Sequence, residues 1–184
     1  MNSTSTFTAD TFNAVNVLIL GDVILDHYLM GRVERISPEA PVPVIMHEKE
    51  DYRLGGAANV ALNIQALGAI PHLISVVGAD ENANRFKNLL KQNHIHTQGI
   101  LTDTQRPTTI KTRVLARNQQ LFRYDREQTN LLPSKITDKL KKTILDTLDT
   151  ASIKVVIFQD YNKGLLTIDL INFTIQEAKK RGFL

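Results

Sequence analysis

The chain has 184 residues, of which 42% are hydrophobic and 22% are charged, so it can bury one hydrophobic core of ordinary size. Its net charge of +3 is small and its basic residues are scattered among acidic ones, which argues against a nucleic-acid-binding protein. The absence of cysteine excludes a disulfide scaffold and thiolate zinc sites, and fits a reducing compartment. The sequence has no apolar run of membrane-spanning length and no signal peptide, so we expect a cytoplasmic protein without membrane contact.

Hydrophobic spacing along the chain switches between the period of strands and that of helices, which predicts an α/β fold. After a polar leader at 1–14, residues 17–20 are continuously apolar, as in a strand covered on both faces. Helical spacing follows at 57–67, and Gly68 stands where a glycine often ends a helix. A second buried strand is predicted at 72–77.

Predicted helices and strands continue to alternate in the second half of the chain. Asp80 and Ser134 can each cap a helix with an apolar face. A further buried strand is predicted at 154–158, and Thr167 begins the last helix.

Two segments break this alternation. Residues 42–50 and 108–125 have the mixed polar and apolar composition of partly exposed strands, and the second turns near Asn118. Pro41 and Pro43 confine the first to a sheet edge or a strand start. We therefore expect one α/β domain over 15–184 that carries a small β extension.

Two motifs predict a ligand site where strands end and helices begin. The first apolar run ends in two carboxylates, Asp22 and Asp26, and such groups can hold pairs of sugar hydroxyls. Gly55 and Gly56 lead into a predicted helix with Asn59 on its first turn, which leaves backbone N–H groups and an amide beside an open backbone. From the residues alone, the alternatives are acids that cap a loop and an ordinary tight turn.

Cationic side chains supply a second part of the predicted site. Lys111 and Arg113 share one face of a strand, which suits a sugar phosphate but also suits an edge strand protected against aggregation. Asp160 and Lys163 follow the strand predicted at 154–158. There Lys163 could reach a phosphate, and Asp160 could hold water around a magnesium ion or orient the lysine. An ordinary polar loop is the alternative.

His94 and His96 lie two residues apart and would share a face on a strand. No carboxylate or thiol stands near them at a ligand spacing. We therefore expect a surface strand here and no metal site.

Six segments follow one another in a recognisable order: Gly21-Asp-Val-Ile-Leu-Asp26, Arg35-Ile-Ser-Pro-Glu-Ala-Pro-Val-Pro-Val44, Gly55-Gly-Ala-Ala-Asn-Val-Ala61, Pro107-Thr-Thr-Ile-Lys-Thr-Arg113, Arg117-Asn-Gln-Gln-Leu121 and Asp160-Tyr-Asn-Lys-Gly164. Together they resemble the ribokinase-like (phosphofructokinase-B) carbohydrate kinases, and among them most closely the heptose 7-phosphate kinases. The resemblance implies a three-layer α/β sheet whose extra strands form a lid over the sugar and pair with a second subunit in a homodimer. It implies ATP and Mg²⁺ as cofactors, and phosphorylation of D-glycero-D-manno-heptose 7-phosphate at O1 for ADP-heptose and lipopolysaccharide core synthesis.

The resemblance also implies which residues contact the substrate. They are Asp22, Asp26, Gly55, Gly56, Asn59, Lys111, Arg113, Gln120, Asp160 and Lys163. The Gly-Ala-Gly-Asp segment with the base of these kinases is absent, so we expect it beyond Leu184, in a missing or separate C-terminal half, and expect the chain alone to be inactive. The rival functions are a non-catalytic, sugar-phosphate-binding or dimerising remnant, and a related kinase with another sugar substrate.

Overall fold

The computed structural model describes residues 12–117 and 119–183. Its strands are β1 (Asn16–Gly21), β2 (Val23–Ile36), β3 (Pro43–Gly56), β4 (Ile70–Val77), β5 (Ile100–Thr102), β6 (Ile110–Ala116), β7 (Gln119–Arg126) and β8 (Val155–Gln159). Its helices are α1 (Ala57–Ala66), α2 (Glu81–Gln92), α3 (Ser134–Thr150) and α4 (Ile168–Lys180). Most of the predicted leader at 1–14, and Asn118 at the predicted turn, lie outside the described residues.

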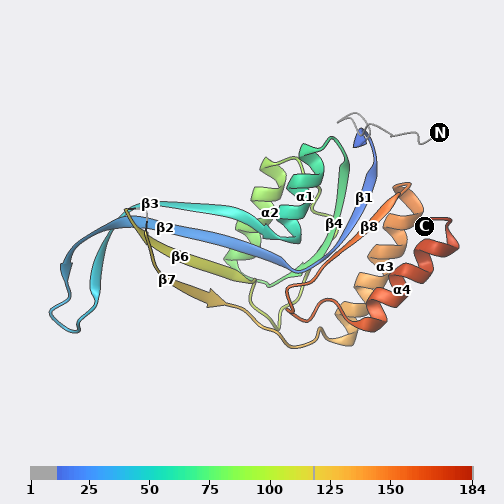
Figure 1. Cartoon of the computed structure of the whole chain (residues 1–184). Helices are drawn as coiled ribbons and strands as arrows, with labels where there is room; N and C mark the ends of the chain where they lie inside the picture. The colour runs from blue at the N-terminus through green and yellow to red at the C-terminus, as the bar shows by residue number, and fades with distance from the viewer. Residues whose placement is uncertain (1–11, 118, 184) are drawn as a thin grey trace, which may run out of the picture.

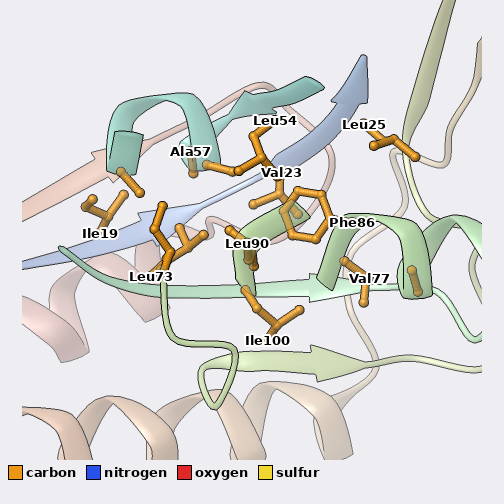
Figure 2. Close-up of a cluster of buried hydrophobic side chains, with 14 of the residues drawn as sticks. Ile19, Val23, Leu25, Leu54, Ala57, Leu73, Val77, Phe86, Leu90 and Ile100 are labelled. Atoms are coloured by element: carbon orange, nitrogen blue, oxygen red, sulfur yellow. The ribbon is translucent and has the colours of Figure 1, made fainter. Parts of the chain in front are cut away.

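The first sheet is parallel and has the strand order β5-β4-β1-β8. Because side chains alternate along β1, Val17 and Ile19 join the cluster with α1 and α2, whereas Leu18 and Leu20 join the cluster with α3 and α4. Figure 2 shows the first cluster, in which Phe86 of α2 lies near Val23. The predicted three-layer α/β architecture is confirmed.

The second sheet has the order β3-β2-β6-β7 and extends away from the layered part of the molecule (Figure 1). β2 pairs with β3 in an antiparallel hairpin and with β6 in parallel, and β6 pairs with β7 in a second antiparallel hairpin. Extended segments are predicted at 42–50 and 108–125, and β3, β6 and β7 overlap them. The strand β2 is not evident from the sequence, because only Asp22 separates it from β1 and the two look like one apolar run.

Three further local expectations were wrong. The strand at 154–158 was expected to be buried, yet β8 is partly exposed because it pairs only with β1 in the described part of the chain. Ser134 does not cap α3, since the cap position belongs to Pro133. His94 and His96 lie in the loop between α2 and β5 and not on a strand.

The predicted ends of the other helices are confirmed. Asp80 caps α2 by accepting the Ala83 N–H, and Thr167 caps α4 by accepting the Leu170 N–H. Gly68 follows the end of α1 with a positive φ of 89°, which suits a glycine. None of the helices among the described residues is long and apolar enough to cross a membrane.

Candidate functional site

The junction of β3 and α1 consists of the two predicted glycines, with no loop between the elements. Gly56 has a φ of 59°, and a Cβ atom there would lie 2.4 Å from the Asp22 carbonyl oxygen. That oxygen accepts the N–H of Ala57, the first residue of α1, at 2.8 Å. Only glycine therefore lets the chain turn here while its backbone stays against the end of β1.

Asp26 lies directly beside this junction. A Cβ atom on Gly55 would be 2.3 Å from Asp26 Oδ2, so the glycine makes room for the carboxylate. The other oxygen, Oδ1, accepts a hydrogen bond of 2.5 Å from Nη1 of Arg113 on the neighbouring strand β6. Asp26 was expected just beyond a strand, but it lies within β2, because the strand continues into the second sheet.

The Asp26–Arg113 pair is partly shielded from water, since the two side chains are 19% and 22% exposed. Burial lowers the pKa of Arg113, but the hydrogen bond and negative charge of Asp26 outweigh it and raise that pKa. The guanidinium also lies over the ring of Tyr28, 5.3 Å from its centroid. Arg113 is thus held in one orientation on the face of the second sheet that also carries Asp26 and Lys111.

Two lysines converge on one carboxylate at the edge of this face. Lys111 of β6 donates to Asp125 at 2.6 Å and to Glu127 at 3.3 Å, and Lys163 donates to Glu127 at 2.8 Å. The two lysine side chains are only 15% and 14% exposed. The hydrogen bond from Lys163 is the main reason that the pKa of Glu127 is lowered, and Lys111 adds to it.

Asp22 holds the loop that carries Lys163. Its Oδ2 accepts the backbone N–H groups of Tyr161 and Lys163 at 3.0 and 3.1 Å, and the residue is 4% exposed. Burial raises the pKa of Asp22, although these two hydrogen bonds oppose the rise. Asp160 is exposed and accepts the Asn162 N–H at 2.7 Å, which stabilises the turn.

Five of the predicted residues lie in two adjoining clusters, and two others lie apart from them. Lys111 and Lys163 meet at one carboxylate, and Arg113, Asp26 and Gly55 form an adjoining cluster on the second sheet. Asn59 is exposed on the first turn of α1. Gln120 lies apart from them, because it pairs with Leu115 near the distal end of β6, whereas Lys111 is at the proximal end.

Sequence reasoning missed Asp125 and Glu127, the carboxylates that contact the lysines. The signal was present in the segment Arg123-Tyr-Asp-Arg-Glu127, where charged residues alternate as on one face of a strand. Its pairing with Lys111 depends on the register between β6 and β7, which sets Lys111 opposite Asp125.

No three histidine, cysteine or carboxylate side chains of the described residues lie together as metal ligands. The carboxylates of the site are already engaged, since Asp26 binds Arg113 and Glu127 binds two lysines. These carboxylates are therefore not assigned to Mg²⁺.

Comparison with known proteins relates the chain to one family. The profile described as the pfkB family of carbohydrate kinases matches residues 15–168. The chain is 46% identical over 166 residues to the bifunctional protein HldE of Helicobacter pylori strain P12, which covers 89% of this chain and 35% of that protein. It is 44% identical over 170 residues to the HldE protein of Geobacter sulfurreducens, covering 91% and 34%. The chain thus spans about a third of the length of these curated relatives.

Solved structures share the fold at low sequence identity. The crystal structure of a putative phosphofructokinase from Staphylococcus aureus has a TM-score of 0.68 and 13% identity, and the match covers 91% of this chain and 51% of that one. Phosphofructokinase-2 from Escherichia coli, in its tetrameric inhibited form, has a TM-score of 0.62 and 16% identity, with coverage of 92% and 53%. These similarities show the ribokinase-like fold.

Proposed function

Because the chain belongs to the pfkB family of carbohydrate kinases, we propose that it is the sugar-binding part of an ATP-dependent kinase that phosphorylates D-glycero-D-manno-heptose 7-phosphate at O1. The single observation that carries this proposal is the convergence of Lys111 and Lys163 beside the Asp26–Arg113 pair. Poorly exposed cations that meet at one point suit a dianionic phosphate. The choice of heptose rests on the six segments that resemble heptose 7-phosphate kinases.

On the sugar side, each group has a distinct task. Asp26 accepts hydrogen bonds from sugar hydroxyls, and Gly55 lets the sugar approach its carboxylate. Asn59 and the N–H groups at the start of α1 donate to further oxygens. The phosphate of the sugar replaces Glu127 between Lys111 and Lys163, and Arg113 lies close enough on the same face to orient the sugar.

Transfer of a phosphoryl group requires alignment, charge neutralisation and a base for the attacking hydroxyl. We assign only the alignment and the sugar-phosphate charge to residues of this chain. ATP supplies the phosphoryl group, and no described residue is assigned to it. We therefore expect the chain alone to bind the sugar phosphate without turnover. In a complete kinase, this phosphorylation would make a precursor of ADP-heptose in the cytoplasm.

We also infer that the second sheet is a lid and that two copies pair through it. Large apolar side chains are exposed on this sheet, including Met46 on β3 and Phe122 and Tyr124 on β7. Exposed apolar side chains on the outer strands of a sheet favour association. The partner with the matching surface is a second copy of the chain.

A calorimetric titration tests the proposed substrate. We expect heptose 7-phosphate to bind at least about tenfold more tightly than unphosphorylated heptose, because only the phosphorylated sugar fills both the space between the two lysines and the space beside Asp26 and Gly55. Fructose 6-phosphate serves as the comparison for the sugar part. Substituting both lysines, as Lys111→Met and Lys163→Met, removes this preference. Lys154→Met, on an exposed residue before β8, is the matched control. Equal binding of the three sugars would contradict the proposal.

A parallel assay follows release of ADP from ATP in the presence of Mg²⁺ and heptose 7-phosphate. We expect no sugar-dependent release. Turnover at an ordinary kinase rate, on the order of 1–100 per second, would contradict the assignment of binding alone and would make Asp22 and Asp160 the first candidates for the base.

A further inference from the structure

Arg106 is a buried arginine in the loop between β5 and β6, and none of the roles assigned above involves it. Its side chain is only 9% exposed. The guanidinium Nη1 donates to the Lys163 carbonyl at 3.0 Å, and Nη2 donates to the Asn130 carbonyl at 2.8 Å. Its Nε faces Asp103 Oδ2 at 3.3 Å without forming an aligned hydrogen bond. Removing an arginine from water costs several kcal/mol, which hydrogen bonds and ion pairing must compensate.

The two carbonyl groups belong to the two segments that carry the Lys163–Glu127 ion pair. One is the loop 160–164, and the other connects β7 to α3 and begins with Glu127. The segments also touch directly, since a Cβ atom on Gly164 would lie 2.1 Å from the Asn130 carbonyl oxygen. One planar guanidinium therefore fixes the backbones that set where Lys163 and Glu127 lie.

Lys163 is held from both sides of its backbone. Asp22 accepts its N–H at 3.1 Å, and Arg106 donates to its carbonyl at 3.0 Å. These two charged side chains also line a small cavity of about 10 Å³ together with Lys163. The ammonium of Lys163 then reaches Glu127 from a constrained backbone.

We propose that Arg106 is a positioning residue for the phosphate subsite. It sets the gap between Lys163 and Lys111 by holding the backbone of Lys163 and Asn130, and it does not touch the ligand. A substrate phosphate that replaces Glu127 must bridge the same two ammonium groups, so the width of the gap affects how well a phosphorylated sugar binds. This inference rests on the proposed function, because it concerns the same sugar-phosphate site.

The test compares two affinities, for heptose 7-phosphate and for unphosphorylated heptose, in wild-type protein and in Arg106→Gln. We expect the variant to lose about tenfold in affinity for the phosphorylated sugar and less than about twofold for the other. Arg106→Lys should not restore the preference, because one ammonium cannot reproduce the fork that spans two carbonyls. Arg181→Gln is the control, since Arg181 also binds a carboxylate and a carbonyl, at the end of α4.

Asp103→Asn provides a milder variant should Arg106→Gln fail to fold. It leaves the guanidinium in place but removes the buried negative charge beside it, and we expect a smaller loss of the same preference. If either folded variant weakens the binding of both sugars equally, Arg106 is merely structural and the inference is overturned.

The failures of the two proposals are distinguishable. A wild-type chain without preference for the phosphorylated sugar removes the proposed function, and the role of Arg106 with it. A wild-type preference that persists unchanged in Arg106→Gln removes the role of Arg106 alone.

Discussion

Asp26 is oriented by contacts within the fold, and we propose that the same carboxylate binds the sugar. Its Oδ1 binds Arg113, and its Oδ2 faces the space that Gly55 leaves without a side chain. A carboxylate in this position is oriented by one cation while its second oxygen remains next to an open backbone. Orientation before binding lowers the entropy that a ligand must lose.

We predict that Asp26→Asn reduces affinity for heptose 7-phosphate about ten- to a hundredfold, because charge-assisted hydrogen bonds to the sugar are lost. Isothermal titration measures the effect. Asp51→Asn is the matched control, since Asp51 lies one strand away on β3 and binds Arg53. An unchanged affinity in Asp26→Asn would show that the carboxylate serves the fold only.

Glu127 should make stability depend on pH in a defined direction. Its pKa is lowered in the folded chain by Lys163 and Lys111. The folded state therefore binds fewer protons than the unfolded state, and the stabilisation is complete above the unfolded pKa and is lost as pH falls through the folded pKa.

We predict that acidification from about pH 7 to about pH 3.5 lowers the free energy of unfolding more in the wild-type chain than in Glu127→Gln, which cannot titrate. Urea unfolding at the two pH values gives this difference. Glu34→Gln, on an exposed residue of β2, serves as control. Equal losses in wild type and Glu127→Gln would mean that the two lysines do not perturb the carboxyl group.

At the scale of elements, the direct passage from β3 into α1 depends on Gly56. Its positive φ of 59° disfavours residues with a side chain, and the nearby Asp22 carbonyl oxygen leaves no room for a Cβ atom. A Gly56→Ala variant must strain its backbone and also move the end of β1. Gly182 has a positive φ of 73° too, but a Cβ atom there meets nothing within 4 Å.

We predict that Gly56→Ala lowers the free energy of unfolding by about 3 kcal/mol or more, and Gly182→Ala by only about 1 kcal/mol. Chemical denaturation of the two variants measures the contrast. Similar values for both would mean that the close approach to Asp22 contributes nothing.

The sequence predicted elements well wherever one local pattern decided the structure. The helical spacing before Gly68 located α1, and Asp80 located the start of α2. The sequence did not predict elements whose structure depends on pairing between distant segments. β2 is a strand of the second sheet because Asp26 and its neighbours pair with β3 and β6, and no local pattern contains that information.

The residues of the candidate site likewise differ in how far the sequence could predict them. Gly55, Gly56 and the cations Lys111 and Lys163 could be singled out from residue type and spacing. Which carboxylates the lysines contact could not be predicted, because Glu127 meets Lys163 only after α3 and β8 have brought residues 36 positions apart together. The role of Arg106 likewise depends on backbone carbonyls, which carry no signature in a sequence.

At the scale of the whole molecule, a layered α/β body carries an extended second sheet (Figure 1). Its outer strand β7 exposes Phe122 by 54% and Tyr124 by 59%. Because Phe122 and Tyr124 are two residues apart on the strand, with the charged Arg123 between them, their rings lie on the same face. Such an arrangement gives the sheet a surface on which a second copy can pack.

We predict that the chain is a dimer in sedimentation experiments and that Phe122→Glu converts it to a monomer, because a charge at this surface is costly to bury. Leu131→Glu, on a residue 70% exposed outside the second sheet, should leave the dimer intact. A dimer that persists in Phe122→Glu would place the interface elsewhere.

A crystal structure of the chain with heptose 7-phosphate tests the proposed binding site. We predict the 7-phosphate within hydrogen-bond distance of Lys111 and Lys163, with Glu127 displaced, and the sugar hydroxyls against Asp26 and Gly55. A phosphate bound away from both lysines, or a sugar bound while Glu127 keeps its two ion pairs, would contradict it.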